Sequence, residues 1–245
     1  MKKSGFTLIE LSIVLVIISL IVGGIVGGKA LIQSAKLHQV SVYFNEFYIA
    51  VNNFKLQYDA LPGDFNEAED YWGANCVPGN SCNGNGDGVI TGLSETLPFW
   101  KHLSLAEIWP NALTGDDGGS IAGFATPGEN VPEGPLDQSG FIVAYNAWAD
   151  TYPSYGKYGH NFQFASIVLG RDYLTGGALK PKEARIIDKK MDDGIADEGK
   201  VRPGYTREIS GANTDCTGNA PIFSSSGSYN LDSNQNSCVL LFFWD

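Results

Sequence analysis

The chain has 245 residues, of which 43% are hydrophobic, and its formal net charge is −11 at pH 7. This hydrophobic content is ordinary for a folded protein, and the length is sufficient for one sizeable globular domain beside an apolar N-terminal segment. The acidic balance argues against nucleic acid or anionic lipid as the partner of the exposed domain.

The chain begins with a short basic leader and a long apolar stretch. The 23 residues of the range 6–28 contain Glu10 as their only charged residue, and Lys2, Lys3 and Lys29 flank them. A helix of this length spans roughly 35 Å, which is enough to cross the hydrocarbon core of a bilayer. The two N-terminal lysines favour a cytoplasmic N-terminus, so the bulk of the chain is expected on the outer side.

Glu10 is the informative residue of this stretch. A carboxylate in the middle of a membrane costs on the order of 3 kcal/mol, so a helix that served only as an anchor would not carry it. If the peptide bond before Phe6 were cut, the new α-amino group would lie one helical turn from Glu10. The same amine could instead meet Glu10 of a neighbouring chain, and that pairing would neutralise the carboxylate only in an assembly.

These residues carry a resemblance to a known family. The sequence KKSG-FTLIE at residues 2–10, followed by an unbroken apolar run, resembles the N-terminal signal of type IV pilins and type II secretion pseudopilins. The resemblance implies that a prepilin peptidase cuts between Gly5 and Phe6 and N-methylates Phe6. It also implies that Glu10 aligns subunits in a helical filament. A plain signal anchor, or a secretory signal cleaved after the apolar run, would explain neither Glu10 nor the Gly5–Phe6 pair.

The resemblance implies an α+β fold in which a long N-terminal α-helix packs on an antiparallel β-sheet head. The domains are then a leader peptide at 1–5, a transmembrane and polymerisation helix at 6–28, an amphipathic helix at 29–58 and a globular head at 59–245. The implied partners are identical or related subunits, the prepilin peptidase, an assembly platform in the inner membrane and the membrane itself through residues 6–28.

The helix is expected to continue beyond the membrane. Between Lys29 and Tyr58 there is no proline, and apolar residues alternate by three and four positions. This spacing predicts an amphipathic helix with one face on a single partner surface, either the head or a coiled-coil seam. The stripe consists of Leu37, Val40, Phe44, Phe47, Val51, Phe54 and Tyr58. His38 lies off the stripe and is expected at the surface, and the sequence Leu61-Pro62-Gly63-Asp64 is expected to end the helix.

The four cysteines form two pairs that are close in sequence, Cys76 with Cys82 and Cys216 with Cys238. An even number of cysteines in an exported domain indicates disulfides, and among the three possible connectivities we expect the pairing of nearest neighbours. Zinc is disfavoured because there is no Cys-x-x-Cys motif. Pilins have a comparable C-terminal disulfide region, which implies the same role for the second pair.

A glycine-rich segment follows the first cysteine pair, with oxygen-bearing side chains at alternating positions and a glycine after the third. This pattern matches the first half of a calcium loop with Asn83, Asn85, Asp87 and the Val89 carbonyl as ligands. The acidic residue that would complete the loop, Glu95, comes one position late. The alternatives are a weak calcium site, with an affinity of about 10⁻⁴–10⁻³ M, and a glycine-rich hairpin turn held by a disulfide.

Further elements follow in the chain. We expect a helix capped by Ser94 and carrying His102 as a packed or surface histidine, strands at 141–145, 162–169 and 239–244, and a helix from Pro181 to Gly194. Asp188, Asp192, Asp193 and Asp197 accompany that last helix, and they are interpreted as a solvated face or, alternatively, as a metal site.

The sequence shows no catalytic constellation that would indicate an enzyme. The leading hypothesis is a structural subunit, a major or minor pilin of a type IV pilus-like filament. Its head would lie in the periplasm before assembly and on the cell surface afterwards. The alternatives are a pseudopilin of a type II secretion system and a membrane-anchored, exported enzyme or binding domain.

Overall fold

The structure is a computed structural model of the chain. It describes residues 7–74, 76, 81–116, 125–146, 159–167, 176–204, 214–217 and 228–244. A single long helix and a four-stranded antiparallel sheet dominate these residues, which confirms the expected α+β fold with a helix packed on a sheet.

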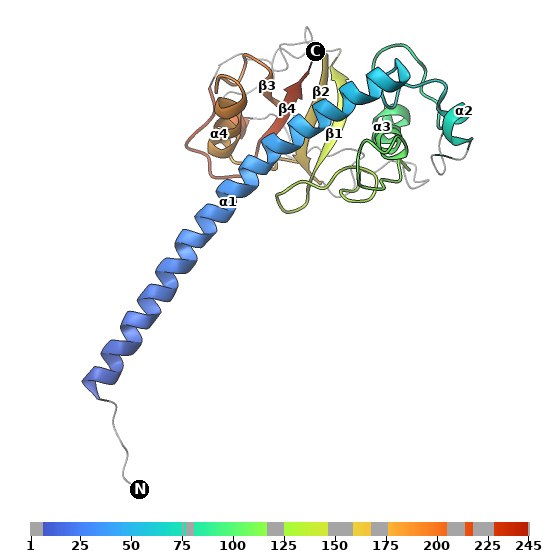
Figure 1. Cartoon of the computed structure of the whole chain (residues 1–245). Coiled ribbons are helices and arrows are strands. Elements are labelled where there is room, and N and C mark those ends of the chain that lie inside the picture. The colour runs from blue at the N-terminus through green and yellow to red at the C-terminus, as the bar shows by residue number, and fades with distance from the viewer. Residues whose placement is uncertain are drawn as a thin grey trace.

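Helix α1 runs without interruption over the 51 residues Leu8–Tyr58. Its N-terminal half projects away from the head, and its C-terminal half lies across the head (Figure 1). The large apolar residues between Leu8 and Ile32 are exposed, whereas the buried positions of the helix begin at Leu37. The projecting half is long and apolar enough to cross a membrane. The helix therefore contains both segments that the sequence predicts, joined without a break through Gly23 and Gly28.

The end of α1 has a simple local cause. Asp59 adopts a left-handed conformation with φ 51°, and its N–H donates to the carbonyl of Lys55. Pro62 and Gly63 follow, and Gly63 has φ +83°. This conformation favours glycine, so the chain reverses direction at the position where the sequence predicts the end of the helix.

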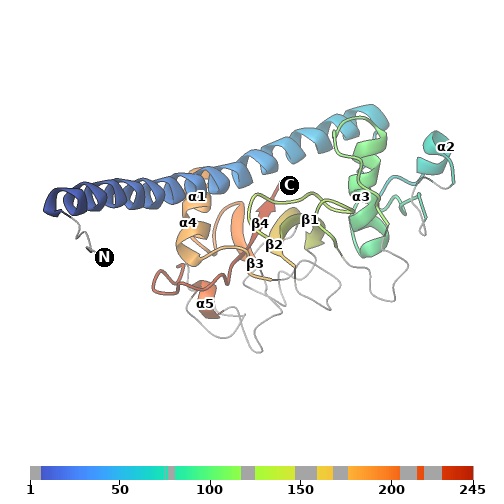
Figure 2. The same ribbon diagram turned by 90° about the horizontal axis from the view of Figure 1, so that it is seen from below.

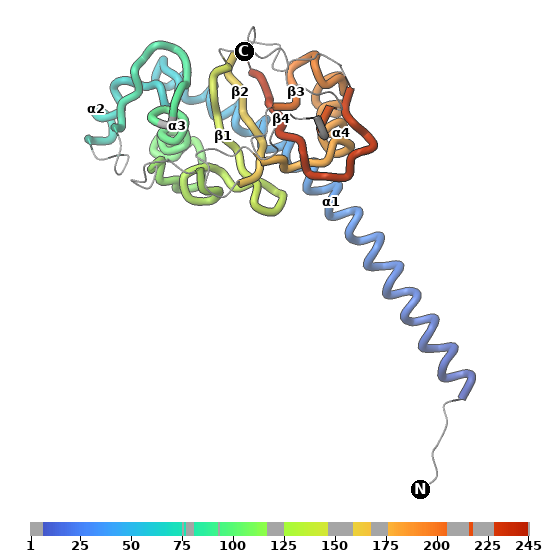
Figure 3. The backbone as a smooth tube through the Cα atoms, turned by 180° about the vertical axis from the view of Figure 1, so that it is seen from behind, coloured from blue at the N-terminus to red at the C-terminus, as the bar shows by residue number. Residues whose placement is uncertain are grey.

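The sheet has the strand order β1-β2-β4-β3, and every neighbouring pair is antiparallel. Its strands are β1 (Ser139–Asn146), β2 (Gly159–Ser166), β3 (Val201–Gly204) and β4 (Val239–Phe243). Figure 3 shows these strands side by side from the face opposite α1. The register places Phe141 opposite Phe164 and Phe162 opposite Phe242, so one face of the sheet is rich in phenylalanine.

Four short helices surround this pair of layers: α2 (Ala68–Trp72), α3 (Leu93–Leu105), α4 (Pro181–Met191) and α5 (Thr214–Thr217). In Figure 2, α3 lies at the C-terminal end of α1, and α4 lies where α1 leaves the head. The prediction that Ser94 caps α3 is wrong. Gly92 occupies that position with φ 67°, and its carbonyl accepts the Thr96 N–H, so Ser94 lies inside the first turn.

The core lies between the C-terminal half of α1 and the sheet. Phe47 is completely buried, and its ring centroid lies 4.8 Å from that of Trp100, 5.0 Å from that of Phe141 and 5.3 Å from that of Phe162. Phe44 adds a contact of 5.0 Å with Phe242. One turn of α1 thus contacts α3 and three strands, which explains why the head is built on this half of the helix.

Candidate functional site

The N-terminus of α1 is a capping box. The Thr7 hydroxyl accepts the Glu10 N–H at 3.3 Å, and the Glu10 carboxylate accepts the Thr7 N–H at 2.8 Å. The Thr7 hydroxyl also donates to the same carboxylate oxygen at 2.7 Å. Sequences of the form Thr-x-x-Glu favour this reciprocal arrangement because it satisfies backbone donors that the first turn of a helix leaves open.

The capping box gives Glu10 a partner within its own chain. The carboxylate lies at the positive end of the helix dipole and accepts two hydrogen bonds, which offsets part of the free energy of placing it in hydrocarbon. The capping box also directs the Glu10 carboxylate toward Thr7. The backbone nitrogen of Thr7 is one peptide unit from that of Phe6. Gly5 and Phe6, the expected processing residues, lie outside the described residues.

The glycine-rich loop after the first cysteine pair folds around a carboxylate that the sequence reasoning missed. Asp64 is almost completely buried, and one of its oxygens accepts the Gly86 N–H at 2.7 Å and the Asp87 N–H at 3.1 Å. Its other oxygen accepts the Gly88 N–H at 2.9 Å. Because Asp64 directly follows the turn at the end of α1, the loop is fastened to the tip of that helix.

The structure brings some of the expected calcium ligands together and separates others. Asn85 and Asp87 each accept a backbone N–H two residues further on, from Asp87 and Val89, as in the tight turns of calcium loops. Glu95 reaches the same loop and accepts the N–H groups of Thr91 at 2.7 Å and Asn85 at 3.4 Å.

Asn83 points elsewhere. Its side-chain oxygen accepts the N–H of Glu69 at 2.8 Å, so it connects the loop to helix α2. Glu95 is buried, and burial raises the pKa of this carboxyl group, as do the nearby carboxylates of Asp64 and Asp87. Within the described part of the chain, no cationic side chain is paired with these three carboxylates.

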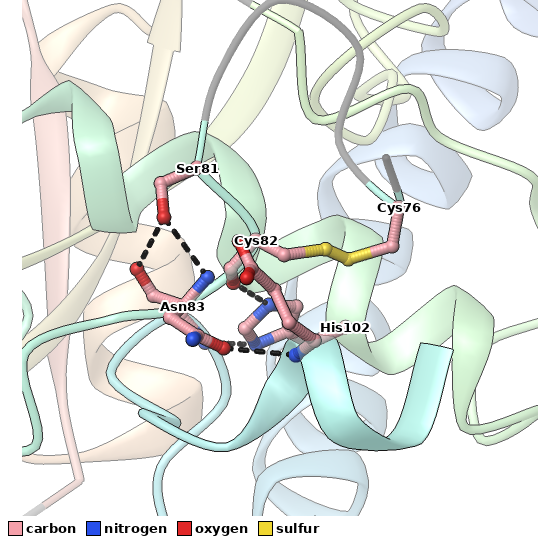
Figure 4. The surroundings of a disulfide bond; sticks show 7 residues. Cys76, Ser81, Cys82, Asn83 and His102 are labelled. Atoms are coloured by element: carbon pink, nitrogen blue, oxygen red, sulfur yellow. Dashed lines mark hydrogen bonds between the residues drawn. A yellow bond between two sulfur atoms is a disulfide. The ribbon is translucent and has the colours of Figure 1, made fainter. Parts of the chain in front are cut away.

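His102 is a buried structural link, not a surface residue. Its Nδ1 accepts the N–H of Gly63 at 2.9 Å, and its Nε2 lies 2.8 Å from the carbonyl oxygen of Cys82. One ring nitrogen must therefore accept and the other donate, which requires the neutral imidazole. Figure 4 shows the ring beneath the bridge between Cys76 and Cys82. The ring thus holds the turn after α1 against the disulfide loop.

His102 makes the stability of the head depend on pH. Burial lowers its pKa from 6.5 to about 4, so between these values the unfolded chain binds a proton that the folded chain does not. The free energy of unfolding should therefore fall as the pH drops from about 6.5 to about 4. A pKa difference of this size corresponds to about 3 kcal/mol.

Titration of Asp188 changes the free energy of unfolding in the opposite direction. The effect of His102 is therefore measured in a variant that lacks the Asp188 carboxylate. Burial raises the pKa of Asp188 from 3.8 to about 6, so the folded chain binds the additional proton and is destabilised as the pH rises through that window. We expect Asp188→Asn to lose about 2–3 kcal/mol between pH 7.5 and pH 4.5 in denaturant titrations of the full chain in detergent. Adding His102→Gln, which keeps a donor and an acceptor, should remove most of that loss. Equal losses in the two variants would contradict this role of His102.

In the acidic cluster beside α4, Asp192 and Asp193 are exposed, as expected for a solvated face, whereas Asp188 is not. Asp188 is fully buried, accepts the Tyr229 hydroxyl at 2.8 Å and accepts the Gly194 N–H at 3.2 Å. One oxygen of its carboxylate and one oxygen from each of Asp192 and Asp193 all lie within 4.8 Å of one another. Asp188 is therefore part of the packing between α4 and the C-terminal segment.

The two disulfides join Cys76 to Cys82 and Cys216 to Cys238, which is the pairing of nearest neighbours. Cys238 precedes strand β4, and the backbone of Leu179 pairs with that of Cys238. The second bridge therefore connects α5 to the sheet next to the start of α4.

Comparison with known proteins addresses the N-terminus. Residues 1–26 match a family model described as a prokaryotic N-terminal methylation motif. The chain carries a prepilin signal. This is the signal of type IV pilins and pseudopilins, and it indicates an exported structural subunit that a prepilin peptidase processes. With the apolar half of α1, the prepilin signal indicates membrane anchoring before assembly into a filament. Neither a search of curated proteins nor a search of solved structures found a match.

Proposed function

We propose that this chain is a pilin, the major or a minor subunit of a type IV pilus-like filament on the cell surface. The observation that carries the proposal is the combination of the prepilin signal with the long exposed apolar half of α1, which contains a single carboxylate, that of Glu10. In a monomer the exposed apolar side chains of this half of α1 must be covered by lipid. In a filament the helices of neighbouring subunits cover one another, and Glu10 exchanges its capping partner for the Phe6 amine of a neighbour.

A disulfide-bonded head supports a pilin over a pseudopilin, because a surface filament is exposed to shear and proteolysis outside the cell. The test compares a deletion strain that lacks this chain with the parent strain that produces it. Electron microscopy of sheared surface filaments should show filaments that contain this chain only in the parent. Intact filaments in the deletion strain, with secreted proteins retained in the periplasm, would favour the pseudopilin alternative. Neither defect would favour a membrane-anchored binding domain.

We also propose that the loop around Asp64 binds calcium. The support is electrostatic, because Asp64 from the turn after α1 and Glu95 from the first turn of α3 are both buried against this loop, and Asp87 of the loop is close to both. Their oxygens are not gathered as closely as those of the acidic cluster beside α4, so a bound ion would draw them inward. Asn85, Asp87 and Glu95 would serve as ligands with Asp64, while Asn83 remains bonded to Glu69.

Calcium should then raise the melting temperature of the head. With an affinity of about 10⁻⁴–10⁻³ M, 10 mM calcium is expected to contribute about 1.4–2.7 kcal/mol, or a rise of several degrees. The rise should disappear with a chelator and in Glu95→Gln, and it should persist in the control Asp70→Asn, which alters an exposed acid of α2. An unchanged melting temperature in 10 mM calcium would refute the calcium site.

A further inference from the structure

The base of the head is basic, although the chain as a whole carries a net charge of −11. Residues 29–40 of α1 contain two lysines and no acidic residue, and α4 together with the residue before it contains five basic residues. We call this group the basic collar: Lys29, Lys36, Lys180, Lys182, Arg185, Lys189 and Lys190. The average charge of the chain therefore does not describe the end of the head from which the apolar helix emerges.

Contacts with α1 determine how far the collar lies from the apolar half. Gln33 donates to the carboxylate of Glu183 at 2.7 Å, and the Lys190 ammonium lies 2.6 Å from Nδ1 of His38. Gln33 is five residues beyond Gly28, or roughly 8 Å along the helix axis. The start of α4 is thus close to the depth at which the apolar segment ends (Figure 1).

That depth is the depth of lipid headgroups. If the apolar half of α1 fills the hydrocarbon core, the headgroup layer covers about the next 5–8 Å, and attraction to its charges extends roughly 8–10 Å into solution. Lysine and arginine side chains reach several ångströms toward an interface from their backbone positions. The exposed cations at the start of α4 are therefore close enough to contact phosphate groups. The end of α4, where Lys190 contacts His38, lies roughly 15 Å beyond Gly28 and within range of the electrostatic attraction.

One face of α4 is exposed and cationic. Lys182, Arg185 and Lys189 share this exposed face with Ile186, which is 58% exposed, whereas Ala184 and Ile187 on the other side are buried. Clusters of lysine and arginine beside a membrane-spanning helix are attracted to anionic headgroups.

The acidic side chains of α4 itself already accept hydrogen bonds within the chain. Glu183 accepts hydrogen bonds from Gln33 and from the Lys180 N–H, and Asp188 is buried against Tyr229. Asp192, at the end of α4, accepts backbone N–H groups of Lys200 and Val201. The exposed face of α4 itself therefore presents only cations and Ile186.

We propose that the basic collar binds anionic phospholipid headgroups of the outer leaflet while the subunit is stored in the membrane. Two features of the molecule select this partner: the charge complementarity, and the continuity of the collar with the apolar helix. The collar would hold the head against the bilayer and fix its orientation before extraction into a filament. This inference rests on the membrane-anchored stage of the proposed function, but not on the filament.

The test uses the full chain reconstituted in nanodiscs, with a fluorophore at Ile186→Cys and spin-labelled headgroups as quencher. The four native cysteines are protected in disulfides. Quenching should be at least about twofold stronger with anionic phosphatidylglycerol than with phosphatidylcholine alone, and about 0.5 M salt should abolish the difference. A fluorophore at Tyr71→Cys, at the far end of the head, should show no quenching in either bilayer.

A variant pair makes the assignment specific. Lys182→Gln/Arg185→Gln/Lys189→Gln should lose the dependence on anionic lipid, whereas Lys55→Gln/Lys101→Gln, at the other end of the head, should retain it. Equal quenching in both bilayers, or an unaffected triple variant, would overturn the proposal. Unchanged quenching combined with impaired filaments in the triple variant would also overturn it, and would assign the collar to the acidic surface of a second copy. Because quenching needs no filaments, its failure is distinguishable from failure of the pilin proposal.

Discussion

Glu10→Ala is expected to abolish surface filaments or reduce them to a small fraction, while the head remains folded. In the filament the carboxylate would pair with the Phe6 amine of a neighbour, and its loss would leave that amine buried without a counter-charge. An uncompensated charge in a low-dielectric environment costs several kcal/mol per subunit. The loss of filaments is measured as filament yield in shear fractions. The folding of the head is measured as its melting temperature.

Two further substitutions serve as controls for Glu10. Ser12 lies in the same apolar stretch, and its hydroxyl bonds only to the carbonyl of Ile9, so Ser12→Ala should assemble normally. Thr7→Val removes the hydroxyl of the capping box but keeps the carboxylate, and because Glu10 gives up this hydroxyl on assembly, the variant should still form filaments. Normal filaments from Glu10→Ala would contradict the assembly mechanism.

Phe47→Ala is expected to destabilise the head by about 3–5 kcal/mol, the usual cost of removing a fully buried phenylalanine. Phe47 contacts the rings of Trp100, Phe141 and Phe162, so its loss leaves a cavity where α1, α3 and the sheet meet. Leu56→Ala is the matched control, because Leu56 belongs to the same helix but is 87% exposed. It should change the free energy of unfolding by less than about 0.5 kcal/mol.

Denaturant titration of both variants checks this expectation. A loss below about 1 kcal/mol for Phe47→Ala would show that α1 is not the core helix of the head. A loss for Leu56→Ala as large as that for Phe47→Ala would show that the exposed face of this half of α1 is also packed. Either result would contradict the assignment of one buried face and one exposed face to the C-terminal half of α1.

The division of α1 into an apolar half and an amphipathic half was predictable because it depends on local periodicity. The stripe that includes Val40, Phe47 and Phe54 recurs every three or four residues, and the structure buries these residues on one face. The strands around Phe141 and Phe162 were likewise predictable from their apolar and aromatic residues. The capping box was missed, although its signal, a threonine three positions before a glutamate, is present in the sequence.

The environment of the glycine-rich loop was not predictable in the same way. Asp64 binds N–H groups more than twenty residues further along the chain, and His102 joins Gly63 to Cys82 across similar separations. No local pattern specifies such contacts, because they depend on how the turn after α1 and helix α3 meet. The burial of Asp188 has the same cause, since its partner Tyr229 lies in a distant segment.

In the proposed mechanism, cleavage exposes the Phe6 amine, and assembly then places this amine beside Glu10 of another subunit. The most direct measurement is mass spectrometry of the subunit N-terminus in material sheared from the cell surface, with electron microscopy of the same fraction. We predict filaments whose subunits begin with N-methylated Phe6. A surface product that still begins at Met1 and remains monomeric would contradict the account.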